Sequence, residues 1–529
     1  MKLRDYQIEL LNKIKDSNNK RNCVQLSTGG GKTIIFSHLA NNYNGRVLIL
    51  VNRIELLEQT ERNINRECSL ITAGTNLIEF TPVTIGMVES VNNRLKKGLF
   101  DVNGFDLIIV DEIQNLQFTK VLENFEGRVL GFTATPVIDK RDFYFKCRYC
   151  ETKHPIKTNC CGVEAKEFSK KLTLKKWYGD LITGTPISEL IEGDFLTEVH
   201  NFVCDSPQLD KLKTDKSGQF TAKSEEEAFD NFSSLDNLIL NYETHCKGIK
   251  TMVFNSGIKS NRNAYEKFVE LGYSVRSYDS KSDEDRSEIV EWFRNTPDAV
   301  LMSVGVFTTG FDVDDVQAII MNKATHSLSL YHQIVGRGGR ITQKIFKPFF
   351  KLIDLGGNVN RFGSWSKNVD WETLYNSDDE KQRRVSDLED FKTCKECEAM
   401  ISHYPCEYCG AAQPEAKQSE GTTESVIAKA LHRLPPPKPS HILNYAKAKG
   451  LDINGAKKLT ANYIVDMFIY SQTSKATAIK KSADLEMKMR KFITPIYFAL
   501  HGSDLEGNRK RTIEDFVKKV KEKINKYYE

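Results

Sequence analysis

The stretch of sequence that decides the fold reads Ser27-Thr28-Gly29-Gly30-Gly31-Lys32-Thr33. The apolar-leaning residues 23–26 before it predict a short strand, and residues 34–36 after it predict the start of a helix. Glycines let backbone N–H groups converge on phosphate oxygens, and the N-terminus of a helix adds partial positive charge. Lys32 would then contact the β- and γ-phosphates of a nucleotide, and the Thr33 hydroxyl would help to hold Mg²⁺. The stretch therefore predicts a phosphate-binding loop.

One position departs from the full G-x-x-x-x-G-K-[ST] pattern, because Leu26 stands where the first glycine belongs. A Gly-Lys-Thr tripeptide alone could be an ordinary turn before a helix. Three consecutive glycines between a strand and a helix favour nucleotide binding over that alternative.

The composition limits the class of protein. With 529 residues the chain is too long for one core and should form three or four domains. It is 40% hydrophobic and 28% charged, as is typical of a globular protein. The sequence contains no run of about eighteen apolar residues, so we expect no transmembrane helix. Residues 1–6 lack the apolar core of a signal peptide. We therefore expect a cytoplasmic protein that has no membrane partner.

Short apolar runs alternate with amphipathic segments in two parts of the chain, which predicts parallel α/β sheets. In the first part the predicted buried strands are residues 47–51, 83–87, 107–110 and 129–132. In the second part, residues 246–356, they are 251–254, 299–302 and 318–321. Continuous apolar runs are typical of strands that are covered on both faces.

Two adjacent carboxylates, Asp111 and Glu112, directly follow the predicted strand 107–110. Ligands of open α/β sheets bind at this end of the strands. Asp111 could hold the Mg²⁺ that bridges the β- and γ-phosphates, and Glu112 could orient or deprotonate the attacking water. Such a pair can also serve as the negative charge at a helix N-terminus. Its position after a phosphate-binding loop favours the catalytic interpretation.

Seven segments of the chain resemble, in order, the motifs of superfamily 2 helicases. They are Arg4 with Tyr6-Gln7, residues 27–33, Arg53 with Glu55-Leu56 and Gln59, Asp111-Glu112-Ile113-Gln114, Thr133-Ala134-Thr135-Pro136, Thr309-Gly310-Phe311-Asp312, and Gln333-Ile334-Val335-Gly336-Arg337-Gly338-Gly339-Arg340. The resemblance covers about residues 1–360. Gln114 is a departure, because most members of the family have His or Asp there.

This resemblance implies two RecA-like domains with ATP in the cleft between them. The residues that would bind ATP are Arg4, Gln7, Ser27, Thr28, Gly29, Gly30, Gly31, Lys32, Thr33, Gly310 and Asp312. Mg²⁺ would be held by Thr33 and Asp111. The residues that would carry catalysis are Lys32, Asp111, Glu112, Gln333, Arg337 and Arg340. By the same matching, the nucleic-acid face would contain Arg53, Thr84, Asn255 and Thr308; an ordinary surface residue is the alternative for each.

Residue chemistry independently supports the two arginines of the last motif. An arginine is always charged and forks onto phosphate oxygens, so Arg337 and Arg340 could stabilise charge that develops on the γ-phosphate. Since they would come from the second domain, hydrolysis would depend on closure of the cleft.

A narrower likeness involves residues 185–196, 353–358 and 361–363, which resemble segments of RadD-like bacterial and phage helicases. This resemblance implies action on forked or branched DNA in replication, recombination or repair, with travel in the 3′-to-5′ direction. Single-strand-binding or recombination proteins are the protein partners that it suggests. The location would be the cytoplasm of a bacterial or phage-infected cell.

Eight of the twelve cysteines lie in two tight groups, and a cytoplasmic setting favours metal over disulfides. The second group is the stronger zinc signal: its ligands would be Cys394, Cys397, Cys406 and Cys409. Two C-x-x-C pairs close a tetrahedral thiolate site, which is typically structural.

The first cysteine group is less regular. Its ligands would be Cys147, Cys150, Cys160 and Cys161, with Thr158 in the place of a regular first cysteine. Cys160 and Cys161 could both bind zinc, or His154 could replace one of them; a loop with incidental thiols is the alternative. The surrounding basic residues suggest an inserted finger that faces nucleic acid; they are Lys146, Arg148, Lys153 and Lys157.

The predicted fold class is α/β, with two RecA-like parallel-sheet domains in tandem, an inserted zinc finger, a C-terminal zinc ribbon and a helical C-terminal region. The predicted boundaries are 1–185 for the first RecA-like domain (finger at about 143–175), 186–245 for a connector, 246–360 for the second RecA-like domain, 361–415 for the zinc ribbon and 416–529 for a linker and basic helical domain. Residues 475–529 carry 14 Lys/Arg against 8 Asp/Glu. A solvated helical face or a nucleic-acid contact would explain this excess.

The sequence favours an ATP-dependent DNA helicase or translocase. Four alternatives remain open: an RNA-dependent ATPase or helicase, a double-stranded DNA translocase without strand separation, a zinc-dependent recruitment protein with a degenerate motor, and the motor subunit of a restriction system. Intact Lys32, Asp111, Glu112, Arg337 and Arg340 argue against a degenerate motor.

Overall fold

The computed structural model describes most of residues 3–377. The described residues are 3–75, 81–138, 141–147, 150, 152–154, 157, 159–161, 163–164, 166–203, 209, 211–215, 218–282, 284–307, 313–377, 392–393, 400–401 and 429–430. The predicted zinc ligands Cys394, Cys397, Cys406 and Cys409 lie outside them, and so does the predicted linker and basic helical region 416–529 apart from residues 429–430. So does the predicted motif at 309–312.

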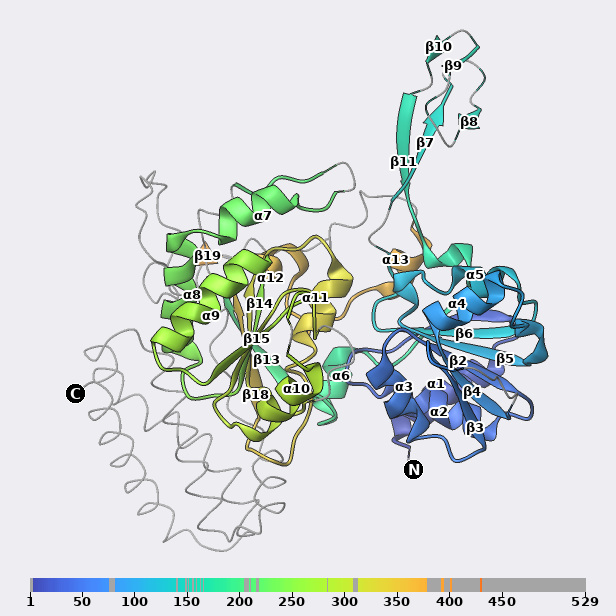
Figure 1. Ribbon diagram of the computed structural model, residues 1–529, viewed down its shortest axis with the longest axis horizontal. Helices are drawn as coiled ribbons and strands as arrows, with labels where there is room; N and C mark the ends of the chain where they lie inside the picture. The colour runs from blue at the N-terminus through green and yellow to red at the C-terminus, as the bar shows by residue number, and fades with distance from the viewer. Residues whose placement is uncertain are drawn as a thin grey trace, which may run out of the picture.

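The first lobe is a parallel seven-stranded sheet with helices on both faces (Figure 1). Its strand order is β12-β1-β6-β5-β2-β4-β3. The strands are β1 Arg21–Gln25, β2 Val47–Val51, β3 Cys68–Ile71, β4 Val83–Met87, β5 Leu107–Asp111, β6 Arg128–Thr133 and β12 Asp180–Thr183. The helices are α1 Asp5–Asp16, α2 Lys32–Asn42, α3 Ile54–Glu61, α4 Val88–Lys96 and α5 Thr119–Glu123.

The second lobe has a seven-stranded sheet of order β15-β16-β14-β17-β18-β13-β21. Its strands are β13 Glu198–Val203, β14 Thr251–Asn255, β15 Val275–Tyr278, β16 Val300–Ser303, β17 Ala318–Asn322, β18 Phe349–Asp354 and β21 Lys429–Ala430. All pair in parallel except β21, which is antiparallel to β13. The helices are α7 Ala222–Phe229, α8 Phe232–His245, α9 Ile258–Glu270, α10 Arg286–Asn295, α11 Leu328–Val335 and α12 Asn358–Phe362.

The two parallel α/β lobes confirm the prediction of two RecA-like domains. The apolar runs 47–51 and 318–321 form β2 and most of β17, and both strands are fully buried. Strand β13 was not predicted: it lies in the stretch 186–245 that the sequence predicts as a connector, yet it pairs with β18 in the second sheet.

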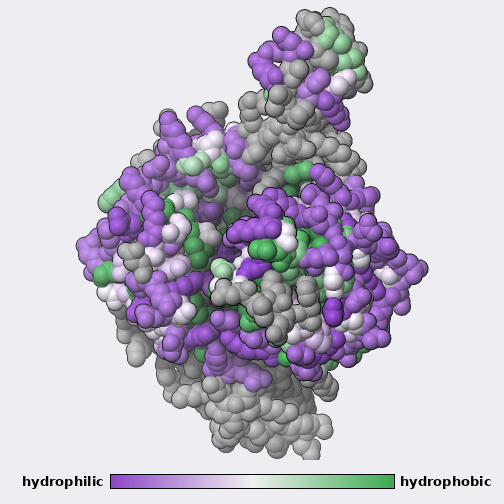
Figure 2. Space-filling view, turned by 45° about the vertical axis from the view of Figure 1, so that its right-hand side comes forward, coloured by the Kyte–Doolittle hydropathy of each residue, from purple (hydrophilic) through white to green (hydrophobic). Residues whose placement is uncertain are grey.

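An arm is inserted between β6 and β12. Strands β7 (Arg141–Lys146) and β11 (Lys166–Lys171) pair in antiparallel fashion over six residues each. Beyond them lie three short strands: β8 Lys153–His154, β9 Asn159–Cys160 and β10 Val163–Glu164. Figures 1 and 2 show the outer part of this arm standing clear of the two lobes.

Within the described residues, two chain segments join the lobes. The first runs from β12 through α6 (Ile187–Glu192) to β13. The second returns from the second lobe through Trp365 to α13 (Trp371–Asn376), where the buried Tyr375 hydroxyl donates a hydrogen bond to Tyr178 O at 2.9 Å. Tyr375 packs in the core of the first lobe with Cys23 and Tyr178. The two lobes are therefore tied together twice.

No helix within the described part of the chain is both long enough and apolar enough to cross a membrane.

Candidate active site

The phosphate-binding loop follows β1 and ends at the first residue of α2, Lys32. Gly29 and Gly31 have φ angles of +85° and +87°, a left-handed conformation that only glycine adopts without strain. A side chain at Gly30 would place its Cβ 2.9 Å from Leu26 Cγ. Leu26, which replaces the usual first glycine, is fully buried and therefore packs beneath the loop.

Helix α1, near the N-terminus of the chain, holds this loop in place through hydrogen bonds. The Tyr6 hydroxyl and the Gln7 amide both donate hydrogen bonds to Gly30 O, at 2.9 and 3.3 Å. The Arg4 guanidinium lies 5.0 Å from the centre of the Phe195 ring. These contacts bring Arg4 and Gln7 beside the loop, as the sequence predicts for residues that bind the nucleotide.

The two carboxylates stand at the end of β5, facing the loop. Lys32 Nζ lies 3.6 Å from Glu112 Oε1, and both side chains are almost buried. Glu112 has a φ of +53°, which is uncommon for a residue other than glycine. Burial, together with the negative charge of Glu112, raises the pKa of Asp111 to about 7.

This environment fits ATP and Mg²⁺. Ser27 Oγ is buried without a hydrogen-bond partner in the described structure, which leaves it available to a phosphate oxygen. A divalent cation beside Asp111 would offset the crowding of two carboxylates in a buried place. Thr33 and Asp111 would hold the ion, which supplies neutralisation of the phosphate charge when it is bound.

A ring of side chains connects Glu112 with the second lobe. Gln114 donates from Nε2 to Glu112 Oε2 and accepts at Oε1 from Thr133 Oγ1, at 2.7 Å. Thr135 Oγ1 donates to Ser329 Oγ at 2.7 Å. Thr133 Oγ1 also accepts from Thr135 N at 3.0 Å, so the polar chain is continuous from Gln114 to Ser329.

Helix α11 of the second lobe closes this ring. Gln333 Nε2 lies 3.3 Å from Glu112 Oε2 and 3.5 Å from Ser329 Oγ. Glu112 is thus contacted from the phosphate-binding loop, from its own turn and from the opposite lobe. Sequence reasoning missed Ser329; its place one helical turn before Gln333, on the same face of α11, was the available signal.

The residues after α11 lie directly on the phosphate-binding loop. A Cβ atom at Gly336 would be 2.7 Å from Thr28 Cβ. A Cβ at Gly29 would be 3.9 Å from Arg340 Cγ, and Arg337 is buried. The structure therefore brings Arg337 and Arg340 to the cleft with Lys32.

Two arginines lie at the mouth of the cleft, one from each lobe. Arg286, at the start of α10, forms an ion pair with Glu55 of α3. Burial and the nearby charge of Arg53 lower the pKa of Arg286 to about 10. Arg286 Nε and Nη2 are buried without hydrogen-bond partners in the described structure. Two close guanidinium groups form a place for an anion.

The structure contradicts two of the predicted nucleic-acid contacts. Thr84 is fully buried within β4, where its hydroxyl shares a hydrogen bond with Ser69. Asn255 is also fully buried and bonds to Asn261 and Asn322. Thr84 thus links β4 to β3, and Asn255 links β14 to β17 and α9, so neither side chain is free to contact nucleic acid. Thr308, Gly310 and Asp312 lie outside the described residues.

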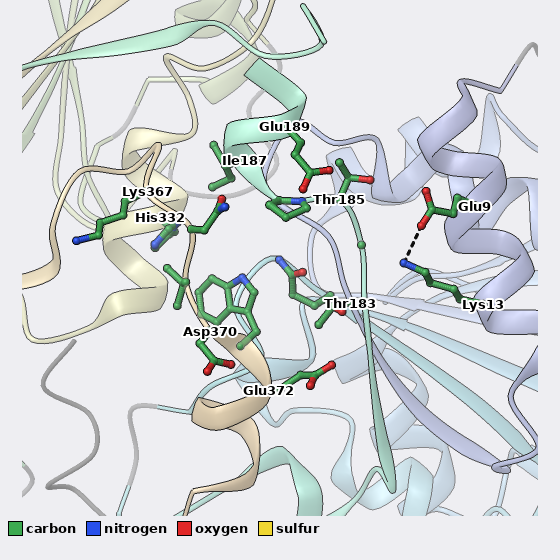
Figure 3. Close-up of a pocket in the computed structure, with 16 residues that line it drawn as sticks. Glu9, Lys13, Thr183, Thr185, Ile187, Glu189, His332, Lys367, Asp370 and Glu372 are labelled. Atoms are coloured by element: carbon green, nitrogen blue, oxygen red, sulfur yellow. Dashed lines mark ion pairs between the residues drawn. The ribbon is translucent and has the colours of Figure 1, made fainter. Parts of the chain in front are cut away.

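A separate cavity of about 400 Å³ lies between the lobes, on another side of α11 (Figure 3). His332 lines it, while the next residue, Gln333, reaches Glu112. Its acidic side chains outnumber its basic ones; they are Glu9, Glu189, Asp370 and Glu372, against Lys13 and Lys367. This lining does not suit phosphate groups, so the cavity is distinct from the nucleotide site.

Of the predicted zinc ligands, the structure brings Cys147, Cys150 and Cys161 together within 4.8 Å at the tip of the arm. The side chain of Cys160 is not among those described. Cys394, Cys397, Cys406 and Cys409 lie outside the described residues.

Comparisons with known proteins agree with this two-lobed site. Residues 1–138 match the family model of the type III restriction enzyme res subunit, and residues 230–342 match that of the helicase conserved C-terminal domain. These two matches support the resemblance to superfamily 2 helicases. The two matched regions contain the first lobe's loop and carboxylates and the second lobe's α11, respectively.

The chain is also similar to three curated proteins. It is 27% identical to a Saccharomyces cerevisiae protein assigned as an ATP-dependent helicase, IRC3, over 67% of this chain and 51% of that protein. It is 24% identical to the 51.5 kDa protein of a Lactococcus phage, over 73% of this chain and 77% of the relative. It is 25% identical to the DNA 3′-5′ translocase XPB2 of Sulfurisphaera tokodaii, over 65% of this chain and 79% of the relative. The chain spans about half the length of the yeast protein.

Proposed function

We propose that this protein is an ATP-dependent DNA helicase or translocase that acts on forked or branched DNA in replication, recombination or repair. One observation carries the proposal: Glu112 is contacted by Lys32 of the first lobe at 3.6 Å and by Gln333 of the second lobe at 3.3 Å. A carboxylate that both lobes contact is suited to hydrolysis that depends on closure.

Different residues of the cleft bind the phosphates, activate water and stabilise charge. The loop's backbone and Lys32 bind the phosphates, and Gln7 holds the loop in place. Glu112 orients the attacking water and accepts its proton. Arg337 and Arg340 stabilise negative charge on the γ-phosphate from the second lobe. Because they act only across a closed cleft, each hydrolysis event can drive one cycle of closing and opening.

Gln114 supports this coupling chemically. An amide side chain donates and accepts at the same time, so it can bond to the Glu112 carboxylate and to the Thr133 hydroxyl together. Through Thr135 this chain reaches Ser329 of the second lobe. A shift of either lobe would therefore be transmitted to the carboxylate that positions water.

The two arginines at the mouth of the cleft favour a nucleic-acid substrate. Arg53 and Arg286 come from different lobes, and Arg286 has buried donors without partners in the described structure. A backbone phosphate would satisfy them, and Glu55 would then yield its place. Movement of the lobes would change the spacing of the two phosphate contacts, which is what stepping along a strand requires.

Several finer features belong to the same proposal. The 3′-to-5′ direction rests on the resemblance to RadD-like helicases and on the name of the archaeal relative. The four cysteines at 394–409 would hold a structural Zn²⁺ by their spacing, beside ATP and Mg²⁺ in the motor. Single-strand-binding or recombination proteins would be its partners. We also propose that the domains have the boundaries predicted from the sequence.

A translocase that moves along duplex DNA without separating strands is the second candidate. The name of the archaeal relative favours it, since that protein is called a translocase rather than a helicase. An RNA-dependent ATPase is the third, because a motor of this kind grips the backbone rather than the bases.

One experiment separates these functions. Strand displacement and ATP hydrolysis are measured together on single-stranded, duplex, forked and four-way DNA and on single-stranded RNA. A helicase displaces strands from forks, a duplex translocase is stimulated by duplex DNA without displacement, and an RNA-dependent enzyme responds to RNA alone. Lys32→Ala is the matched control: stimulated hydrolysis that survives in this variant would overturn the assigned active site.

A further inference from the structure

The tip of the arm holds three cysteine side chains that are close enough to share one metal ion. The Sγ atoms of Cys147, Cys150 and Cys161 all lie within 4.8 Å of one another. Cys147 and Cys150 belong to the turn between β7 and β8, and Cys161 belongs to the turn between β9 and β10. Two hairpins therefore bring their turns to one point.

The backbone of both turns agrees with this arrangement. Cys147 N donates to Thr152 O at 3.0 Å, which closes the turn that carries Cys150. Cys161 has a φ of +50°, a conformation that costs a non-glycine residue on the order of 1 kcal/mol. In this conformation its Sγ atom lies within 4.8 Å of the other two sulfur atoms.

The described residues of the tip form only short strands. Strands β8, β9 and β10 have two residues each, and a hairpin of this size is at best marginally stable in water. Among the described side chains of 147–164, Cys147 alone is buried. Small folds without an apolar core commonly depend on a structural zinc ion for their folding free energy.

We propose that the tip of the arm is a zinc finger in which one Zn²⁺ is bound by the thiolates of Cys147, Cys150 and Cys161 and by the imidazole of His154. Thiolates select zinc over Mg²⁺ and Ca²⁺, which prefer oxygen ligands. Four protein ligands make a closed, structural site. This site is independent of the ATP cleft and of the function proposed for it.

His154 is assigned to the fourth position by two observations. Its Nε2 atom is buried and has no hydrogen-bond partner in the described structure, which is costly for an imidazole nitrogen unless a metal takes the place of a donor. His154 pairs with Phe145 across the hairpin, so these two side chains lie on the same face. Phe145 comes two residues before Cys147 in the chain. The imidazole stands outside the 4.8 Å thiol set, so its side chain has to turn toward the ion.

The zinc content of the full-length protein tests the thiol site. It is measured by elemental mass spectrometry on the purified chain and on a Cys147→Ser/Cys161→Ser double variant. We expect the variant to lose one zinc ion per chain relative to the unaltered protein. The half-buried Cys68, which lies in β3 of the first lobe, provides the matched control, and Cys68→Ser should keep the full content. Equal zinc content in the double variant would overturn the proposal.

Limited proteolysis separates a local effect from general misfolding. In the double variant, new cleavage should be confined to residues 139–171, while basal ATP hydrolysis stays unchanged. If the variant cannot be purified, Co²⁺ is added to the unaltered, metal-stripped protein and to Cys150→Ser. Thiolate-to-cobalt charge-transfer absorption should weaken in Cys150→Ser; identical spectra would contradict the site.

The fourth ligand is tested by comparing His154→Ala with Cys160→Ser. We expect His154→Ala to weaken Zn²⁺ binding about tenfold or more, as measured by competition with a chelating dye, and Cys160→Ser to leave it unchanged. The opposite result would overturn the assignment of His154.

Discussion

The ATP cleft and the tip of the arm are held together by different means. In the cleft, Glu112 is contacted by three segments: Lys32 at the start of α2, Gln114 in the turn after β5 and Gln333 of α11. At the tip, two-residue strands bring three cysteines together, and among the described side chains of 147–164 Cys147 alone is buried. The fold itself preorganises the cleft, whereas the tip depends on a ligand from solution. Small changes in the cleft should therefore affect turnover, and changes at the tip should affect metal content and local order.

The largest effect is expected at Glu112. Glu112→Gln keeps the size of the side chain but removes the base, so the DNA-stimulated turnover number should fall by at least about 100-fold. ATP binding should persist, because Lys32 and the loop remain. The measurement is steady-state hydrolysis together with binding of a fluorescent ATP analogue. A turnover number within about threefold of the unaltered protein would show that Glu112 does not activate water.

Acid should lower the free energy of unfolding through His332, a buried residue of α11. Burial lowers the pKa of His332 from 6.5 to about 4. Between these values the unfolded chain takes up a proton that the folded chain excludes, so stability falls as the pH drops through this window. The loss should reach about 2 kcal/mol between about pH 7.5 and about pH 5.

Urea unfolding at the two pH values checks this effect, with His332→Phe as the comparison. The free energy of unfolding of this variant should depend less on pH by that amount. An unchanged pH dependence would mean that other groups account for it. The tip offers a contrast, because acid there would protonate thiolates and release zinc without unfolding the lobes.

Closure of the cleft should be sensitive to one methyl group at Gly336. In Gly336→Ala, the added Cβ would lie 2.7 Å from Thr28 Cβ and 2.8 Å from His332 O. Overpacking of this kind costs about 1–3 kcal/mol, so stimulated hydrolysis should fall about tenfold. Gly257→Ala is the matched control, since its Cβ would meet only Ser260 Oγ, at 4.0 Å. Equal activities of the two variants would argue that the cleft does not close along this contact.

The smallest effect is expected at Ser329, which bonds to Thr135 across the lobes. Ser329→Ala removes the hydrogen bond from Thr135, worth about 1 kcal/mol, together with the longer contact from Gln333 Nε2, so stimulated turnover should fall about fivefold. Thr135→Val should have a similar effect, and the double variant should be no worse than either single one. The turnover numbers of the two single variants and the double variant are measured with and without DNA. Additive losses would show that the two hydroxyls do not act as one link.

Much of the fold could be predicted from local patterns. Strands such as β2 and β17 are continuous apolar runs, and Asp111-Glu112 directly follows such a run. Strand β13 could not be predicted, because its residues Glu198–Val203 include polar side chains that only the neighbouring β18 explains. Thr84 and Asn255 were assigned to a surface by motif position, whereas the sheets bury them; a motif specifies residue type but not exposure.

The sequence alone determined the chemistry of the cleft: a glycine loop ending in Lys32, a carboxylate pair after a strand and two arginines far along the chain. Each of these features is defined by the residue types within one short segment. Tertiary structure decided which of them meet. The contact of Gln333 with Glu112 joins residues 221 positions apart, and that of Ser329 with Thr135 joins residues 194 apart. Such contacts depend on the packing of two lobes, and no local pattern encodes them. The same holds at the tip of the arm, where only folding brings Cys161 to Cys147 and Cys150.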